Sequence, residues 1–231
     1  ANTSETYTAT IGALNPDSIT VESPANFRPD MKNISVWQVS AAGDLVSQVS
    51  TTLAQPALID AISVNKSGVS ILLSRESGQS FTSAKLGIFG KEVKLGSTKS
   101  KFNALERNAE GSTSIFGSSG EALGGKKLVG KIDGILLKIS NSGSIANVVR
   151  SSAPGAIRDW QSSTKTFFLS GVVKTGAKTE TALTKFNSSF GPTWTTRFAS
   201  TGASLAALGS NSSVFAIFEP TSSVKGVTGL K

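Results

Sequence analysis

The chain has 231 residues and a basic balance, with 23 lysines and arginines against 15 acidic residues and a formal net charge of +8. It contains neither cysteine nor histidine. Disulfide frameworks and thiolate chemistry are therefore excluded, and the commonest general base and metal ligand is missing. We accordingly expect no cofactor and no metal site.

The composition is typical of a single all-β domain that spans residues 1–231. Hydrophobic residues make up 38% of the chain, charged residues 16%, and 23 residues are glycine. Many short strands joined by tight turns fit this composition better than helices do, and no apolar run reaches the length of a membrane span. The small and polar start, Ala1 to Glu5, is what signal-peptide removal leaves, although other trimming would look the same. We expect an extracellular or cell-surface location.

The excess positive charge has two interpretations. The lysines are spread along the chain, which favours solvated surface charge, but a face for anionic partners is the alternative. The one flexible basic run, Gly124 to Lys127, has no aromatic companion. Specific nucleic-acid binding is therefore not expected.

A small residue followed by a branched apolar residue recurs five times along the chain. The steps between the apolar residues are about 43, 43, 52 and 48 residues, close to the length of one four-stranded blade of a β-propeller. The five copies are Ser18-Ile19, Ala61-Ile62, Ala104-Leu105, Ala156-Ile157 and Ser204-Leu205.

This period predicts a five-bladed β-propeller. A strand near Thr6 to Gly12 is expected to pair with the C-terminal blade, which closes the ring and leaves no free sheet edge. The alternative is that the chain forms part of a larger ring. The predicted blades cover residues 16–52, 59–100, 102–152, 155–200 and 203–231, the last completed by residues 1–12.

The last two repeats give the clearest strand pattern, because turn residues separate their apolar runs. The fourth repeat is expected to form strands at Ala156–Gln161, Lys165–Val173, Thr181–Asn187 and Thr193–Ala199. The fifth is expected to form strands at Ala203–Gly209, Val214–Glu219 and Lys225–Leu230.

One hairpin is repeated visibly. The residues from Val36 to Leu45 match those from Leu136 to Ile145, 100 positions later, as two strands joined by a polar turn with glycine. The glycine-rich, basic stretch from Gly117 to Lys131 is predicted to be a long loop. Trp37 and Trp194 are expected to pack in the core between blades.

Several segments follow the pattern of one known family. The stretch Thr181–Phe198 contains a strand ending in Lys-Phe, a polar turn with glycine and a strand with Trp194, and is followed by Ala203–Leu205 and by a strand at Val214–Ile217. Asp60–Leu72 has the central part of the same pattern. These residues resemble the bacterial SBBP-type β-propeller repeat, although asparagine or serine often stands where that repeat has aspartate. The resemblance implies an extracellular or surface-attached bacterial propeller and no single activity.

The candidate ligand contacts lie on the predicted innermost strands. Trp160 with Arg158 and Asp159 could stack on a sugar or peptide side chain and hydrogen-bond to it at the mouth of the channel. Glu106, on the innermost strand of the preceding blade, completes this candidate group.

Asp17, Asp60 and Asn103 occupy equivalent positions, two residues before the branched apolar residue of each repeated pair. They are expected to form a polar ring at the channel mouth. Together with Glu106 and Asp159, the acids could supply the paired carboxylates of a glycosidase. Ca²⁺ held by the ring and by backbone carbonyls is a further alternative. Ordinary turn residues are the simpler interpretation, so no catalytic residue is assigned.

The expected function is that of a non-catalytic interaction or structural module of a secreted or cell-surface bacterial protein. Its partner would be a protein or glycan at one propeller face, or further copies of itself in a larger surface structure. One alternative is a carbohydrate-active hydrolase or lyase, which needs channel carboxylates within about 5 to 10 Å of one another. The other is a repeat lectin with similar sugar pockets between blades.

Overall fold

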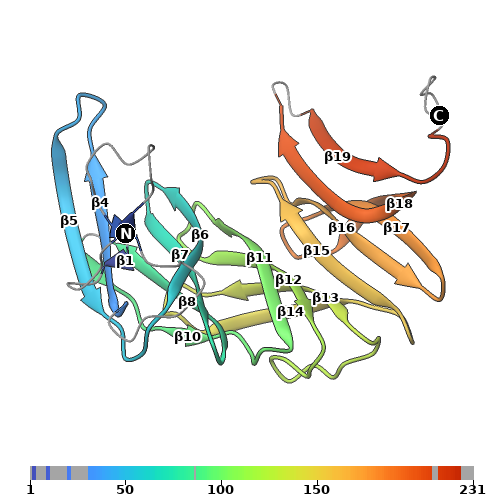
Figure 1. Ribbon diagram of the computed structural model, residues 1–231, viewed down its shortest axis with the longest axis horizontal. Helices are drawn as coiled ribbons and strands as arrows, with labels where there is room; N and C mark the ends of the chain where they lie inside the picture. Colours follow the sequence, from blue (N-terminus) through green and yellow to red (C-terminus); the bar gives the residue numbers. More distant parts are fainter. Residues whose placement is uncertain are drawn as a thin grey trace.

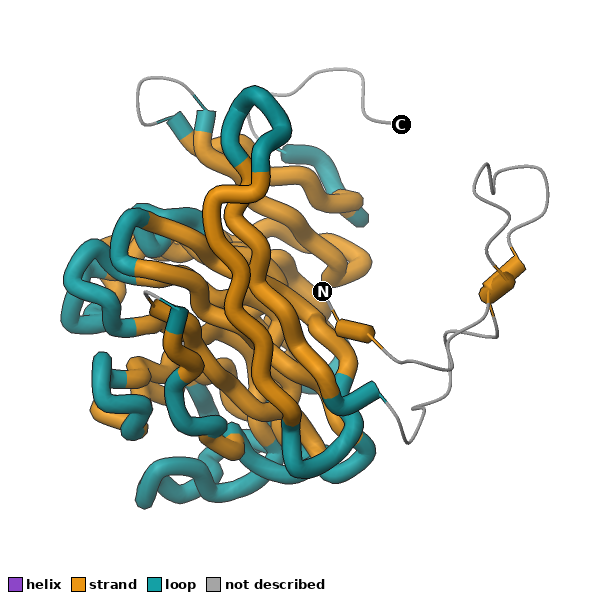
Figure 2. The backbone as a smooth tube through the Cα atoms, turned by 90° about the vertical axis from the view of Figure 1, so that its left-hand side faces the viewer, coloured by secondary structure: helices purple, strands orange, loops and turns teal. Residues whose placement is uncertain are grey.

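The computed structural model describes residues 31–85, 87–209 and 213–224, together with the backbone of three two-residue strands within residues 1–30. Every regular element in these residues is a β-strand (Figures 1 and 2), so the expected all-β class is confirmed. Within the same residues, no helix of the length and apolarity needed to cross a membrane is present.

Four antiparallel sheets of three or more strands follow one another along the chain (Figure 1). The first sheet contains β1 (Asn2–Thr3), β4 (Asn33–Val39) and β5 (Leu45–Thr52). The second contains β6 (Leu58–Asn65), β7 (Gly68–Arg75), β8 (Gly78–Lys85), β9 (Ile88–Phe89) and β10 (Val93–Lys94). The third contains β11 (Ser100–Arg107), β12 (Thr113–Ser119), β13 (Asp133–Ile139) and β14 (Ile145–Ser151). The fourth contains β15 (Ile157–Ser163), β16 (Phe168–Thr175), β17 (Lys178–Phe186), β18 (Pro192–Leu208) and β19 (Val214–Pro220).

The long strand β18 belongs to two hairpins. Residues 192–199 pair with β17, whereas Ser200 and residues 204–208 pair with β19, with a shift in register between Ser200 and Ser204. The strand is continuous across the boundary expected between the fourth and fifth repeats. The predicted strands at Thr193–Ala199, Ala203–Gly209 and Val214–Glu219 are therefore found, the first two as parts of one element.

The hairpin repeated 100 residues apart has the same turn in both places. In each, a serine N–H donates to the carbonyl four residues on, from Ser40 to Asp44 and from Ser140 to Ser144, at 2.8 Å. The fourth residue of each turn has a positive φ, +93° in one copy and +76° in the other, and is glycine. Glycine adopts this backbone at no steric cost, so the turn sequence fixes the hairpin locally.

The first strands of successive repeats lie side by side: β6 contacts β11, β11 contacts β15, and β15 contacts β18, whose second half begins the fifth repeat within the same sheet. Backbone pairing does not join them; instead, polar side chains of one strand bond to the backbone of the next. The bonds are Arg107 N to Ser63 Oγ (2.9 Å), Asn65 Nδ2 to Arg107 O (2.9 Å), Asn103 Nδ2 to Trp160 O (2.8 Å), Ser204 N to Gln161 Oε1 (2.9 Å) and Ala206 N to Ser162 Oγ (3.0 Å).

Hydrophobic side chains fill the spaces between neighbouring sheets. Alternate residues of one strand point to opposite faces, so Ile71 and Leu73 pack toward the first sheet while Leu72 packs toward the third. On β13, Leu136 packs toward the fourth sheet and its neighbour Leu137 toward the second. Sheets covered on both faces account for the nearly continuous buried runs of β7, β12 and β13.

Closure of the ring by the N-terminal strand is not found in the described residues. Ala9–Thr10, which is β2, pairs with β3 (Thr20–Val21), and β1 pairs with β4 rather than with β18 or β19. No described sheet closes on itself. Asp17, the expected strand at Lys225–Leu230 and most of the expected strand at Thr6–Gly12 lie outside the described residues.

Two further expectations are wrong. The long loop does not begin at Gly117, because β12 continues through Ser119. A side chain at Gly117 would overlap the Lys101 carbonyl, which explains a glycine inside a strand. Trp37 and Trp194 are not in the core, since they are 61% and 49% exposed.

Candidate ligand-binding site

Trp160 lies between the third and fourth sheets and is only 5% exposed. Its indole meets the Phe186 ring edge-on, with centroids 5.5 Å apart. It also lies against Gly134 of β13, where an added Cβ would come within 2.8 Å of the indole Nε1. The indole is therefore part of the packing between two sheets and not of an open face.

A cavity of about 290 Å³ adjoins Trp160 at this interface. One wall comes from β13 and β14 of the third sheet and the other from β15 to β18 of the fourth. Its exposed rim carries Pro192, Thr195 and Arg197. The lining residues are Leu136, Val149, Arg150, Ser151, Ser152, Arg158, Trp160, Val173, Ala182, Thr184, Phe186, Phe190, Pro192, Thr195 and Arg197.

Arg150 is held firmly in the cavity wall. Its Nη1 forms a 3.0 Å ion pair with Asp133, a fully buried carboxylate, and its Nη2 donates to the Glu121 carbonyl at 2.6 Å. Asp133 also accepts the backbone N–H groups of Val129 (3.0 Å) and Gly130 (2.8 Å). The charge of Arg150 is thus compensated inside the protein.

Arg158 lacks such a partner: within the described residues it forms no ion pair, and its Nη1 donates to Ser151 Oγ at 3.0 Å. Burial lowers the pKa of its guanidinium, the positive charge of Arg197 lowers that pKa further, and Asp133 acts in the opposite direction. Arg197 itself lies 3.7 Å from Glu180, which Lys178 approaches more closely, at 2.8 Å. Two arginines therefore face the cavity with incomplete compensation.

Three buried N–H donors of residues that line this cavity have no hydrogen-bond partner in the described part of the chain. They are Arg150 Nε, Arg158 Nε and Trp160 Nε1. A buried polar group without a partner costs about 1–3 kcal/mol. All three atoms are buried, and all three belong to side chains that line the cavity.

The other candidate residues lie elsewhere. Asn103 and Asp159 are brought together, with Asn103 Nδ2 3.2 Å from Asp159 Oδ1. Asp60 accepts from Gln79 Nε2 at 2.6 Å within its own sheet and also bonds to Ser74. None of these residues lines the cavity described above.

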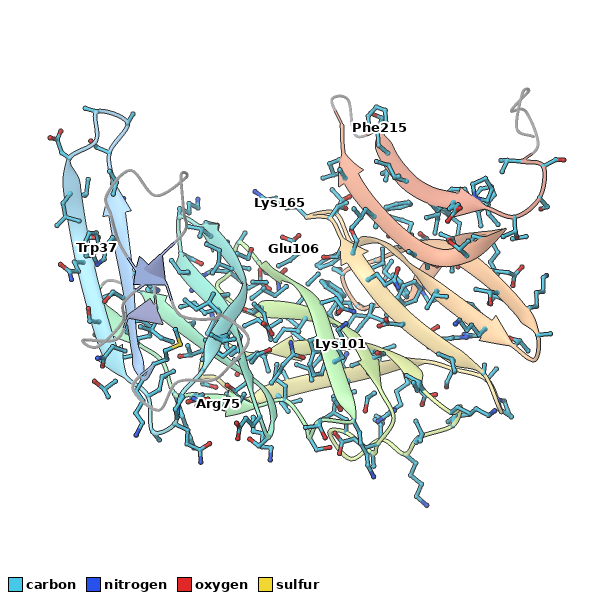
Figure 3. The ribbon with its side chains drawn as sticks, viewed as in Figure 1. Trp37, Arg75, Lys101, Glu106, Lys165 and Phe215 are labelled. Carbon is cyan, nitrogen blue, oxygen red and sulfur yellow. The ribbon has the colours of Figure 1, made fainter. Side chains whose placement is uncertain are left out.

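Glu106 and Asp159 have raised pKa values, and burial is the main cause for both carboxyls. For Glu106 the positive charge of Lys165 opposes the shift (Figure 3), and for Asp159 Ser118, Lys101 and Asn103 oppose it. No second carboxyl contributes to either shift. The described residues also contain no group of three acidic side chains placed to hold a metal ion.

Two arginines of this site were not among the sequence candidates. Arg150 and Arg197 are 47 residues apart, and each lies on the last strand of its four-stranded repeat, Arg150 opposite Ile135 and Arg197 opposite Ala182. This shared position in two successive repeats is the feature of the sequence that could have identified them as candidates.

No family model matches the chain, and no curated protein matches it. Among solved structures it is similar to a protein of unknown function from Bacteroides caccae, with 10% sequence identity and a TM-score of 0.41. The match covers 81% of this chain and 64% of that protein.

Proposed function

We propose that this chain is a non-catalytic binding module whose ligand occupies the cavity between the third and fourth sheets. The observation that carries the proposal is the set of buried donors on Arg150, Arg158 and Trp160, three residues that line the cavity, for which the described part of the chain supplies no acceptor. A ligand that reached these groups with acceptor atoms would remove their cost and would lie between two sheets. Trp160 and Arg158 then act as ligand contacts, approached between the sheets.

The arrangement of the acids supports a role without catalysis. Glycoside hydrolysis requires two carboxyl groups on either side of the reacting bond. Glu106 and Asp159 each have a raised pKa for which burial is the main cause, without a coupled carboxyl, and neither lines the cavity.

The sheets are proposed to be blades of a five-bladed propeller in a secreted or cell-surface bacterial protein. Three features support this architecture: the repeat length, the four-strand order of the third sheet, and the first strands that lie side by side. Ring closure would join the N-terminal residues to the β18–β19 hairpin. The resemblance to the SBBP-type repeat supports the proposed location.

A structural role through self-assembly is a second candidate, favoured by the two ends of the described fold. The β4–β5 turn matches the β13–β14 turn, which joins the third and fourth strands of the four-stranded third sheet. The hairpin β4–β5 therefore corresponds to the third and fourth strands of a repeat, whereas the second half of β18 and β19 correspond to the first and second strands. Trp37, Phe215 and Ile217 on these strands are 61%, 63% and 73% exposed. Figure 3 labels Trp37 and Phe215 on the strands at the two ends. We propose a second copy as the occupant, because β4–β5 of one copy would complete the sheet begun by β18–β19 of another.

Ligand binding is tested by recording ¹H–¹⁵N spectra of the chain with a set of small neutral, anionic and cationic compounds. We expect shifts confined to residues around the cavity, and loss of these shifts in Thr195→Trp, which fills the rim. Thr196→Trp is the matched control, because the next residue of a strand points to the opposite face. Shifts scattered over the surface, or equal binding by both variants, would contradict the proposal.

Self-assembly is tested by sedimentation at rising protein concentration. We expect oligomers that Ile217→Lys dissociates. Ile88→Lys is the control, because Ile88 is also an exposed isoleucine but lies on β9. A monomer at all concentrations would exclude this second role.

A further inference from the structure

We infer that the cavity between the third and fourth sheets binds one carboxylate group carried on a compact apolar body. This inference rests on the proposed function and names the chemical class of the ligand. The donors, the charges and the apolar wall of the cavity each support one part of it.

The unpartnered polar atoms at the cavity are all donors. Arginine and the indole of tryptophan have no acceptor, so Arg150 Nε, Arg158 Nε and Trp160 Nε1 can bond only to a group that accepts hydrogen bonds. A carboxylate accepts several N–H groups at once, and such charge-assisted bonds are about twice as strong as neutral ones. A ligand that presents donors would leave these groups without partners.

The charges call for a ligand with a single negative charge. Arg150 is neutralised by Asp133 at 3.0 Å. Arg158 has no ion-pair partner among the described residues, and Arg197 shares Glu180 with Lys178. One carboxylate near Arg158 and Arg197 would compensate their mutual repulsion. A phosphate group, with a charge of about −1.5 to −2, would exceed the single positive charge of Arg158, the one lining arginine that forms no ion pair with the described residues.

The rest of the cavity wall is apolar and the space is small. Leu136, Val173, Phe186 and Phe190 are buried side chains that line it. Its volume of about 290 Å³ lies at the lower end of the usual range for small-molecule sites. A single aromatic ring or a short branched chain suits this space better than an extended polymer does.

The arginines are not present in every copy of the repeat. Arg150 lies opposite Ile135, and the corresponding pair of the first sheet, 100 residues earlier, is Ser50 opposite Ser35. A charge needed only to build the sheet would be expected in each copy. The presence of Arg150 on one side of the cavity and Arg197 on the other favours a ligand at this interface.

The experiment measures binding of two monocarboxylates, benzoate and 3-methylbutanoate, by calorimetry. Their neutral amides and phenyl phosphate serve as probes of the same shape with a different charge. We expect each carboxylate to bind at least tenfold more tightly than its amide and more tightly than phenyl phosphate. Arg158→Gln should weaken carboxylate binding at least tenfold and leave amide binding unchanged, whereas the exposed Lys174→Gln, which also removes one positive charge, should change neither.

The outcomes separate this inference from the proposed function. Equal binding of carboxylates and amides at the cavity overturns the carboxylate assignment and leaves the binding module intact. Tighter binding of phenyl phosphate overturns the assignment of a single charge. Absence of binding by every probe, together with no cavity shifts from the broader compound set, overturns both. Thermal unfolding of Arg158→Gln verifies that this variant is folded.

Discussion

Phe167 and Phe190 occupy the same position in two hairpin turns, and their rings meet edge to face with centroids 5.8 Å apart. Both have a left-handed backbone, with φ of +56° and +63°. In three other turns with the same hydrogen bonds this position is held by Gly43, Gly111 and Gly143. The fourth sheet thus accepts strain at two bulky residues that glycine would avoid.

The strain is offset by packing against the third sheet. Both rings contact Phe116 of β12, with centroids 6.3 Å from Phe167 and 6.2 Å from Phe190. We predict that Phe190→Ala lowers the free energy of unfolding by about 3–5 kcal/mol, because it removes a buried ring and keeps the strained backbone. Phe190→Gly should be about 1 kcal/mol more stable than Phe190→Ala, since glycine relieves that strain. Denaturation in urea measures both values.

Gly43→Ala is the control for the strain alone. An added Cβ at Gly43 meets nothing within 4 Å, so its cost of about 1–2 kcal/mol would come from the backbone conformation. A Phe190→Ala protein more stable than Phe190→Gly would show that the turn does not impose a left-handed residue.

The bonds between first strands give a second prediction. Ser162 Oγ accepts from Ala206 N at 3.0 Å and donates to Ala206 O at 3.1 Å, in place of a backbone ladder. Ser162→Ala should destabilise the protein by about 1–3 kcal/mol, because both backbone groups lose their partner. Amide hydrogen exchange at Ala206 should accelerate in this variant and stay unchanged in the exposed Ser188→Ala. Unchanged exchange in both would mean that these bonds do not hold the strands together.

A third prediction concerns pH. Burial raises the pKa of Glu106, which means that the folded state favours the neutral carboxyl. The associated stability is fully present below the unfolded pKa of about 4.3 and is lost as pH rises through the higher folded value. Glu106→Gln should therefore be more stable than the parent chain at pH 7 and show a flatter dependence of unfolding free energy on pH.

A substitution of Lys165 tests the Glu106 carboxyl from the opposite direction. Its positive charge lowers the Glu106 pKa, so Lys165→Met should raise that pKa further and reduce stability at neutral pH. In the Glu106→Gln background this loss should disappear. Equal effects of Lys165→Met in both backgrounds would exclude the interaction.

Local turn chemistry made much of the fold predictable. The hairpin at Val36–Leu45 and its copy were recognisable because serine and glycine stand where the turn needs a side-chain acceptor and a positive φ. The strand expected from Lys165 in fact begins at Phe168, since the turn includes Phe167. A non-glycine residue in the left-handed region leaves no signal in the sequence, and its placement depends on tertiary contacts.

The candidate site was predictable only in part, because it forms between sheets. Trp160 and Arg158 were identified from their strand and do line the cavity. Arg150 and Arg197 meet there only after two repeats pack face to face, which no local pattern encodes. The same dependence on packing explains the errors at Trp37 and Trp194, which stay 61% and 49% exposed.

The last prediction concerns the buried ion pair behind the cavity. Asp133 is fully buried and accepts from Arg150 Nη1 at 3.0 Å and from two backbone N–H groups. Asp133→Asn should cost about 3–5 kcal/mol, because it leaves the Arg150 charge buried without a counterion. The double variant Asp133→Asn with Arg150→Met should be more stable than Asp133→Asn alone, since it removes that stranded charge. Strictly additive losses in the double variant would mean that water already solvates Arg150, and the cavity would then be too wet for its unpartnered donors to select an anion.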